Sequence, residues 1–341
     1  MKIWFDILTP KQLLFFGPMI QKLGKNHKIL CTSRKYSQVV DLAKLKRVNL
    51  VLAGKHGGSE REEKLRASTQ RIDRLTDIVS KFSPDLVISF CSPEASRVAF
   101  GLGLKHIVFS DSPHAEAVMR LTLPFAQKLL IPWIIPKEEF VRYGISKNSI
   151  IQYRAIDAAV IVKNKSNIKS IKVDKRKKTI VIRPEESAAA YVLGKASTSN
   201  NIIYEFSKEA KKYNVIVLAR YKPKINSLRK EFGDKVKIMN KVVDGKSLLS
   251  ITDLFIGSGG TMTAEAALMG VPTISYDAVP NHVEKYLVKT GLAKRETNPK
   301  SILQAAKKML EKGSTNKERA QRILNSMEDP YSKLMYAIKA L

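Results

Sequence analysis

Residues 253–275 read DLFIGSGGTMTAEAALMGVPTIS and contain the clearest structural signal of the chain. They predict an apolar strand at 254–256, a glycine turn, a small-residue helix at 261–269 and a second strand that begins after Val271 and Pro272. A glycine turn between a strand and a helix is typical of anion sites. Glycines let the backbone approach a ligand, and the amides of the first helical turn carry partial positive charge.

The residue types around this turn favour a nucleotide as the anion. The candidate nucleotide-binding residues are Gly257, Ser258, Gly259, Gly260, Thr261 and Glu265. Glu265 follows Thr261 by one helical turn on the same face, where a carboxylate suits the two hydroxyls of a ribose. The alternative is a tight turn that only packs the helix on the sheet. The glycine turn, Glu265 and the closing Gly-Val-Pro together favour nucleotide binding.

Length and composition indicate a globular protein of two domains. The chain has 341 residues and an apolar content of 44%. No apolar run reaches the ~20 residues of a transmembrane helix, and the N-terminus is predicted to be a first strand rather than a signal peptide. Cys31 and Cys91 are expected at strand ends, outside any metal or redox motif. We expect a reducing, cytoplasmic compartment.

The charge is strongly basic, with 60 lysines and arginines, 31 acidic residues and a net charge of +29. Such a chain is attracted to nucleic acid, anionic lipid or phosphorylated substrates, although Lys-rich surfaces can also reflect proteome-wide composition. No helix-turn-helix, zinc-finger or RNA-binding signature occurs. We interpret the charge as non-specific attraction to an anionic substrate or surface, which includes the inner face of a membrane.

Strands and helices alternate through both halves of the chain, which predicts parallel sheets with right-handed crossovers. The expected strands are 2–8, 28–31, 50–53, 85–90, 106–110, 128–131, 179–183, 215–219, 236–239, 254–256 and 273–275. The expected helices include 11–23, 36–45, 60–82, 94–102, 201–212, 222–232, 299–311 and 316–327. The pattern decays between residues 151 and 178.

The predicted fold is α/β, with two Rossmann-like domains whose parallel sheets face a central cleft. We expect an N-terminal, acceptor-side domain at 1–160, a linker at 161–178 and a nucleotide-binding domain at 179–329. A C-terminal helix at 330–341 is expected to pack back on the first domain. Ligands bind at the carboxyl ends of strands in such sheets, so each loop after a strand is a candidate.

These loops hold several polar side chains. The candidates in the first half are Asp6, Gln12, His56, Asp111, His114 and Glu116, and those in the second half are Arg183 and Arg220. Asp111 and His114 are the catalytic candidates, because an aspartate could orient the imidazole across the proline turn. The alternative is that Asp111 or Ser112 caps a helix whose dipole Glu116 complements.

The remaining candidates have weaker support. Arg183 and Arg220 could hold phosphate oxygens as forked donors, and His56 is either a lid residue or an exposed turn. No HxxxH, DxD, paired-cysteine or Walker pattern occurs. We therefore expect no metal and no P-loop chemistry.

Longer strings of sequence resemble a known superfamily. The segments WFDILTP, CTSRKYSQ, GKHGGS, SPEASRVAFGLG, FSDSPHAEAVMRLTLPFA and IPKEEFVRYG resemble a mostly archaeal, GT-B-like family of domains of unknown function. Ser258 and Gly259, followed by Glu265 and the Gly270-Val271-Pro272 segment, resemble the donor-nucleotide segment of the lipid-linked N-acetylglucosaminyltransferase of peptidoglycan synthesis. UDP-N-acetylglucosamine 2-epimerases have a similar segment. The resemblance implies a diphosphate at residues 258–261 and a ribose at Glu265.

The chain departs from that GT-B-like family at three places. Gln12 and Leu14 occupy positions where the family usually has histidines, and Pro184 begins a segment that is aromatic and acidic in the family. Gly259 and Gly260 replace a more frequent Ser-Ala pair, which moves the turn towards the transferases. If the family's base is the first-loop histidine, then Asp111 or His114 must replace it, or activity is absent.

The leading hypothesis is a metal-independent GT-B glycosyltransferase that uses a nucleotide sugar, with a UDP-sugar favoured and no cofactor. Backbone dipoles and arginines would stabilise the departing diphosphate, and the acceptor would be lipid-linked or close to a membrane. One alternative is an enzyme like the UDP-sugar 2-epimerases. Another is a non-catalytic protein that binds nucleic acid or a polyanionic glycan. The sequence leaves the sugar, the acceptor and the oligomeric state open.

Overall fold

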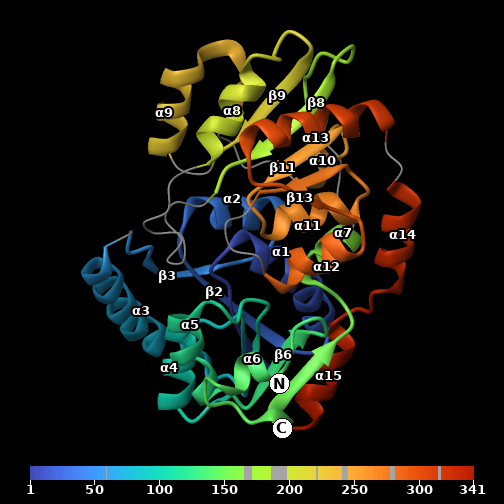
Figure 1. Cartoon of the computed structure of the whole chain (residues 1–341). Coiled ribbons are helices and arrows are strands. Elements are labelled where there is room, and N and C mark those ends of the chain that lie inside the picture. The colour runs from blue at the N-terminus through green and yellow to red at the C-terminus, as the bar shows by residue number, and fades with distance from the viewer. Residues whose placement is uncertain are drawn as a thin grey trace. The chain divides into compact units, whose positions relative to one another are not determined.

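The computed structural model describes residues 1–58, 60–164, 171–185, 198–219, 222–239, 245–276, 281–313 and 316–341. They form two compact units, the first of Met1–Val160 with Glu328–Leu341 and the second of Ile161–Met327. Each unit contains one β-sheet with helices packed on it (Figure 1), and all paired strands are parallel. The prediction of two Rossmann-like α/β domains is confirmed.

The first unit has a seven-stranded sheet of order β3-β2-β1-β4-β5-β6-β7. Its strands are β1 (Lys2–Asp6), β2 (Lys28–Lys35), β3 (Val51–Lys55), β4 (Leu86–Ser89), β5 (Lys105–Phe109), β6 (Lys128–Pro132) and β7 (Ile150–Tyr153). Its helices are α1 (Pro10–Leu23), α2 (Ser37–Lys46), α3 (Arg61–Phe82), α4 (Pro93–Gly101), α5 (Glu116–Arg120), α6 (Glu138–Val141), α7 (Asp157–Lys163, which reaches the second unit) and α15 (Tyr331–Lys339). The strand order changes direction between β1 and β4, which is where ligands bind in open α/β sheets.

Aromatic packing fixes α1 beneath the carboxyl end of the first sheet. The rings of Phe15 and Phe16 lie 5.3 and 5.5 Å from the ring of Phe109, edge-on. Phe15 contacts Phe90 in the same way at 5.4 Å. Each such pair adds about 0.5–1.5 kcal/mol beyond its buried area. The N-terminal turn of α1, with Lys11, is thereby held at the strand ends.

The second unit has a six-stranded sheet of order β10-β9-β8-β11-β12-β13. Its strands are β8 (Lys178–Arg183), β9 (Tyr213–Leu218), β10 (Lys237–Met239), β11 (Leu254–Gly257), β12 (Thr273–Ser275) and β13 (Lys294–Arg295). Its helices are α8 (Ser199–Ser207), α9 (Lys222–Phe232), α10 (Gly245–Leu249), α11 (Thr261–Leu268), α12 (His282–Lys289), α13 (Pro299–Lys312) and α14 (Lys317–Ser326). The order changes direction between β8 and β11.

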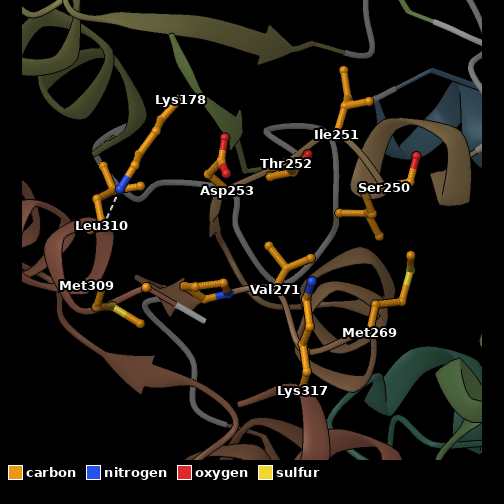
Figure 2. A pocket seen from close by; sticks show the side chains of 14 residues that line it. Lys178, Ser250, Ile251, Thr252, Asp253, Met269, Val271, Met309, Leu310 and Lys317 are labelled. Atoms are coloured by element: carbon orange, nitrogen blue, oxygen red, sulfur yellow. Dashed lines mark hydrogen bonds between the residues drawn. The ribbon is translucent and has the colours of Figure 1, made fainter. Parts of the chain in front are cut away.

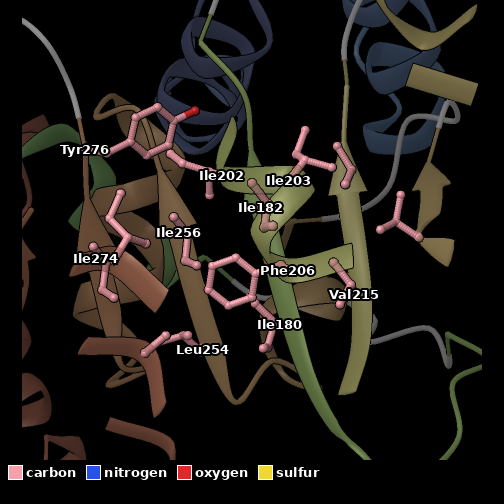
Figure 3. Close-up of a cluster of buried hydrophobic side chains, with 14 of the residues drawn as sticks. Ile180, Ile182, Ile202, Ile203, Phe206, Val215, Leu254, Ile256, Ile274 and Tyr276 are labelled. Carbon is pink, nitrogen blue, oxygen red and sulfur yellow. The ribbon is translucent and has the colours of Figure 1, made fainter. Parts of the chain in front are cut away.

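The second sheet is buried on both faces, as expected of a parallel sheet. Ile180, Ile182 and Ile256 project to one face, where they meet Phe206 of α8 (Figure 3). Alternate residues such as Phe255 project to the other face and pack against α10 and α11. This double burial explains why strands 180–182 and 254–256 are continuous apolar runs.

Several elements differ from the expectations. Strand β7 and helix α7 occupy part of the region where the sequence pattern decays, and α7 continues to Lys163. Helix α8 ends at Ser207, five residues before the expected end, and Cys31 lies within β2 rather than at its end. Short apolar runs such as 158–162 do not reveal whether they form a strand or a helix, because either can be fully buried. None of the described helices has the length and apolar character of a membrane span.

Candidate functional site

The glycine turn lies at the point where the second sheet changes direction. It follows β11, which pairs with β8 on one side and β12 on the other. Gly259 has φ 83° and Gly260 has φ 78° and ψ −171°, a backbone conformation that only glycine adopts readily. Gly260 is the N-cap of α11. The N-cap residue of α11 therefore leaves the first-turn amides uncapped by any side chain of its own.

Gly257 and Thr263 hold the turn in place from inside the unit. A Cβ atom on Gly257 would lie 2.4 Å from Thr263 Oγ1 and 2.6 Å from Phe255 Cε1. The Thr263 hydroxyl donates to the carbonyl of Gly259 at 2.9 Å. The structure thus gives Gly257 a packing role in β11, next to the residues predicted to meet phosphate.

Tyr276 connects two of the predicted residues, Arg183 and Ser258. Its hydroxyl lies 3.0 Å from the Arg183 carbonyl and 3.1 Å from Glu185 Oε2. Burial and the Glu185 carboxylate raise the pKa of Tyr276 well above its usual value, while a hydrogen bond with Ser258 opposes the shift. The Arg183 guanidinium donates to the Leu218 carbonyl at 2.8 Å. Tyr276 cannot be recognised from the sequence as part of this arrangement, because an isolated tyrosine after a strand gives no signal of its own.

Glu265 is buried within α11, with 6% of its surface exposed. Its Oε2 atom approaches Gly245, where an added Cβ would lie 3.2 Å away. Gly245 begins α10, so the Glu265 carboxylate lies beside the first residue of that helix. Arg220, the second arginine predicted to bind phosphate, lies outside the described residues.

Glu284 of α12 and Arg295 of β13 form a charged pair in the second unit. Glu284 is 4% exposed, and both its carboxylate oxygens lie 2.7 Å from Arg295 Nη1. Ser275 also donates to Glu284, and Asn281 caps α12 by accepting from the Glu284 amide at 2.9 Å. An asparagine followed three residues later by a glutamate is the sequence pattern of a helix N-terminus. This pattern could have predicted the start of α12.

In the first unit, Lys11 joins two aspartates. Its Nζ lies 2.5 Å from Asp111 Oδ2 and 2.8 Å from Asp157 Oδ2, and 4.4 Å from the centre of the Phe90 ring. The Tyr153 hydroxyl donates to Asp157 Oδ1 at 2.5 Å, and the Ser112 hydroxyl donates to Asp111 Oδ1 at 2.8 Å. Asp111 thus belongs to a network of partly and fully buried polar groups that includes residues absent from the predicted site.

The environment separates the pKa values of the two aspartates. Burial raises the pKa of Asp157 to about 6, with Lys11 opposing and Asp111 adding to the shift. Burial also acts to raise the pKa of Asp111, but the charge of Lys11 and hydrogen bonds with Lys11, Ser112 and Asp157 together outweigh it and lower that pKa. Two neighbouring carboxyls whose pKa values are driven apart are a common arrangement of a proton donor and a proton acceptor.

His114 and Glu116 are exposed side chains in the segment that follows Asp111. Glu116 pairs with Arg120 one helical turn later, at 2.8 Å, and both side chains are more than half exposed. Asp111 itself contacts Lys11 and Ser112. The charged partner of Asp111 is therefore Lys11, a residue that was not among the predicted site residues.

Two further predicted residues, Asp6 and Gln12, form hydrogen bonds that connect segments within the first unit. Asp6 is fully buried, and its Oδ1 accepts from Arg71 at 2.5 Å and from Thr32 at 2.6 Å. Gln12 accepts from the Leu8 amide at 2.6 Å and donates to the Phe90 carbonyl at 3.5 Å. Gln12 therefore fixes the loop that precedes α1 against the end of β4. His56 is half-buried, and its Nδ1 accepts from the Gly58 amide at 3.0 Å.

A pocket of about 360 Å³ lies at the opposite, amino edge of the second sheet (Figure 2). Lys178 begins β8, Asp253 precedes β11 and Val271 precedes β12, and all three line the pocket. None of the predicted nucleotide-binding residues lines it. Among the residues that the structure describes, no group of three or more His, Cys, Asp or Glu side chains is placed to hold a metal ion.

Comparison with known proteins identifies the family. Residues 1–339 match the family described as "Protein of unknown function (DUF354)", and the chain belongs to it. The chain is 29% identical over 298 residues to "Uncharacterized protein MJ0665" of Methanocaldococcus jannaschii, which covers 84% of this chain and 85% of the relative.

Solved structures of low identity share the fold. One is the UDP-GlcNAc 2-epimerase of Neisseria meningitidis bound to UDP-GlcNAc, with TM-score 0.74, 18% identity and 100% coverage of both chains. Another is the M. jannaschii UDP-GlcNAc 2-epimerase in complex with UDP-GlcNAc and UDP, with TM-score 0.69, 17% identity and coverage of 98% and 100%. The Streptomyces sp. SF2575 glycosyltransferase SsfS6 has TM-score 0.60, 14% identity and coverage of 98% and 99%. The fold of the chain is thus that of GT-B glycosyltransferases and UDP-GlcNAc 2-epimerases.

Proposed function

We propose that this chain is an enzyme that acts on a nucleotide sugar, with a UDP-sugar as the favoured substrate. The observation that carries the proposal is the turn at Gly259 and Gly260, where both residues have positive φ. This turn leads into the first-turn amides of α11 at the switch point of the second sheet, the place between β8 and β11 where the strand order changes direction. Such a turn suits a diphosphate, because several N–H groups converge on one anion. Buried Glu265 in the same helix would bind the ribose.

The favoured reaction is glycosyl transfer without a metal ion. In this proposal the amides of α11 and the hydroxyls of Ser258 and Thr261 stabilise the departing diphosphate. Arg183 and Arg220 would add positive charge there. Removal of one such donor typically lowers a rate by about 10²–10³. The net charge of +29 supports an anionic acceptor or one that is held at an anionic membrane surface.

Asp157 is the group we assign to proton transfer in the first unit, together with the predicted Asp111. A carboxyl with a pKa of about 6 can exchange a proton near neutral pH. In glycosyl transfer, ionised Asp157 would accept the proton of the acceptor hydroxyl as the bond to the sugar forms. Lys11 and Tyr153 would hold its carboxylate in place. His114 remains an alternative base, because its side chain is exposed to incoming groups.

Epimerisation is the second candidate, and the Asp111–Asp157 pair favours it. Inversion at a carbon needs one group that removes a proton and another that delivers one, and these two carboxyls have pKa values shifted in opposite directions. Several solved structures with this fold are named UDP-GlcNAc 2-epimerases. The two reactions can be distinguished by measurement, since epimerisation needs no acceptor and replaces a proton on a sugar carbon.

Thermal unfolding with UDP-, GDP-, ADP- and dTDP-sugars tests nucleotide binding. A ligand at 100 times its Kd adds about 2.7 kcal/mol to the free energy of unfolding, so a clear rise in Tm is expected with one of the nucleotides. Glu265→Ala should lose this rise, whereas Lys178→Ala, at the amino edge of the sheet, should keep it. No rise with any nucleotide, together with salt-sensitive binding to RNA or DNA, would replace the enzyme proposal by polyanion binding.

Incubation of the bound sugar in D2O without acceptor separates the two reactions. Deuterium at the sugar C2, detected by mass spectrometry, would establish epimerisation. Unlabelled sugar that is transferred only when an acceptor is added would establish glycosyl transfer. Asp157→Asn should abolish whichever reaction is observed while leaving the nucleotide-induced rise in Tm unchanged.

A further inference from the structure

Arg34 is an arginine of the first unit that forms no ion pair with any residue that the structure describes. It stands at the end of β2, and its Nε is enclosed by protein without a hydrogen-bond partner among the described residues. Burial lowers the pKa of Arg34, and the carboxylates of Glu94 and Asp6 only partly oppose this effect. Arg34 as a whole is partly exposed. An incoming anion can therefore reach its guanidinium and offset the free energy that partial burial of an unpaired charge costs.

The two nearby carboxylates are already used by a different arginine. Asp6 Oδ1 lies 2.5 Å from Arg71 Nη2, and Glu94 Oε2 lies 3.4 Å from Arg71 Nη1. Arg71 also donates to the Ala53 carbonyl at 3.1 Å. Arg71 therefore satisfies these acceptors from within the fold, and Arg34 forms no ion pair among the residues that the structure describes.

His56 supplies a second donor at the end of the neighbouring strand. The β2–β3 pairing includes Lys35 with Lys55 and is irregular between Ser33 and Lys35. Arg34 and His56 thus lie at the ends of adjacent strands, close enough for the Arg34 charge to lower the pKa of His56. His56 Nδ1 accepts from the Gly58 amide at 3.0 Å. A backbone N–H can only donate, so the ring proton of neutral His56 is on Nε2. Burial, Arg34 and Lys64 lower the pKa of His56 and keep the ring neutral.

The position of the His56 ring is fixed from two sides. The ring lies 6.0 Å from the ring of Tyr36, centre to centre. Gly57 packs so closely on α3 that an added Cβ would lie 2.6 Å from Lys64 Cα. The loop after β3 is thus held against α3. These contacts fix the direction in which the Nε2–H group of His56 donates.

We propose that Arg34 and His56 form a binding site for a small oxyanion, a carboxylate or phosphate group, at the carboxyl edge of the first sheet. Both residues offer only donors in this arrangement, and a planar guanidinium matches the paired oxygens of these groups. Lys64 adds positive charge from α3. The site is built from residues of the first unit alone. Resting on the proposed function, this site selects a substrate or acceptor with an acidic group of its own.

Proton NMR of the histidine rings tests this site directly, because the chain has only five histidines. Phosphate and acetate are titrated separately to about 50 mM at constant ionic strength, with chloride as the balancing anion. Each oxyanion that binds should shift the His56 signal saturably and raise its pKa, because a bound anion favours the imidazolium form. A shift with phosphate alone assigns a phosphate group, and a shift with acetate assigns a carboxylate.

Variants distinguish a built site from general attraction to a basic protein. Arg34→Gln should weaken the oxyanion affinity measured at His56 by about tenfold or more, and Arg34→Lys should restore part of it. Arg142→Gln removes one exposed positive charge at the residue that follows α6 and should leave the affinity unchanged. The signals of the other four histidines report whether each variant is folded. The proposal is overturned if His56 shows no saturable shift, or the same shift in Arg34→Gln.

Discussion

The carboxyl edges of the two sheets have the same topology and different chemistry. In the first unit the edge is filled by charged side chains that pair with one another, such as Arg71 with Asp6 and Lys11 with Asp157. In the second unit, the switch point is formed by the backbone of Gly259 and Gly260, with the Tyr276 hydroxyl nearby. The first edge holds fixed charges at high desolvation cost. The second also has one buried pair, Glu284 with Arg295, but its glycine turn offers backbone donors that need no counterion.

Removal of Arg71 should have the largest effect on stability. Arg71→Met leaves Asp6, which is 0% exposed, without its counterion. Breaking one side of such a buried pair costs about 3–5 kcal/mol of the free energy of unfolding. Urea unfolding followed by tryptophan fluorescence measures the loss, since both tryptophans, Trp4 and Trp133, belong to the first unit.

Arg66→Met is the matched control for this loss. Arg66 lies on the same helix, and its pair with Glu62 is more than 70% exposed on both sides. Exposed pairs contribute under about 1 kcal/mol. Equal losses in the two variants would show that the charge network of the first edge does not stabilise the fold as proposed.

The pH dependence of stability should show the next largest effect. The pKa of Asp157 is raised to about 6 in the folded chain, so the folded state binds the proton more tightly than the unfolded state. This contribution is complete below pH ~4 and is lost as the pH rises through ~6. A shift of about two pKa units corresponds to roughly 3 kcal/mol.

Asp157→Asn provides the measurement of that contribution. The difference in free energy of unfolding between the parent chain and Asp157→Asn should fall as the pH is raised from 4 to 7, with changes in the coupled Asp111–Lys11 pair superimposed. Urea unfolding at a series of pH values gives this difference. A difference that rises over the same interval would mean that Lys11 holds Asp157 ionised, and that Asp157 cannot act as an acid near neutral pH.

Gly257→Ala should have a smaller effect, and it is confined to the second edge. The new Cβ would lie 2.4 Å from Thr263 Oγ1 and 2.6 Å from the Phe255 ring. Overpacking of this kind costs about 1–3 kcal/mol. Hydrogen exchange read by mass spectrometry should show faster exchange in β11 and α11. Gly17→Ala in α1, where nothing lies within 4 Å of the added atom, should be neutral or stabilising.

The glycine turn of the second unit can be recognised from the sequence, whereas the polar network of the first unit cannot. The glycine turn could be recognised because the need for Gly259 and Gly260 arises within a few consecutive residues. The Lys11–Asp111–Asp157 network joins three separate segments, and no local pattern links Lys11 to either aspartate. Position in a loop after a strand predicts Gln12 and Glu116 as residues of the cleft. In the structure Gln12 accepts a hydrogen bond from the Leu8 amide, and Glu116 pairs with Arg120.

The sequence by itself determined the alternating α/β fold, the two parallel sheets and the place of the glycine turn. Period and backbone requirements are local, so a single window of sequence contains them. Only the tertiary structure decided which charges meet: Arg71 with Asp6, Lys11 with Asp157, and Arg34 with no carboxylate partner among the described residues. Which charges meet depends on the strand order. Whether a group is charged depends on its surroundings, because burial disfavours the charged form and a nearby opposite charge favours it. Neither quantity is contained in a short stretch of residues.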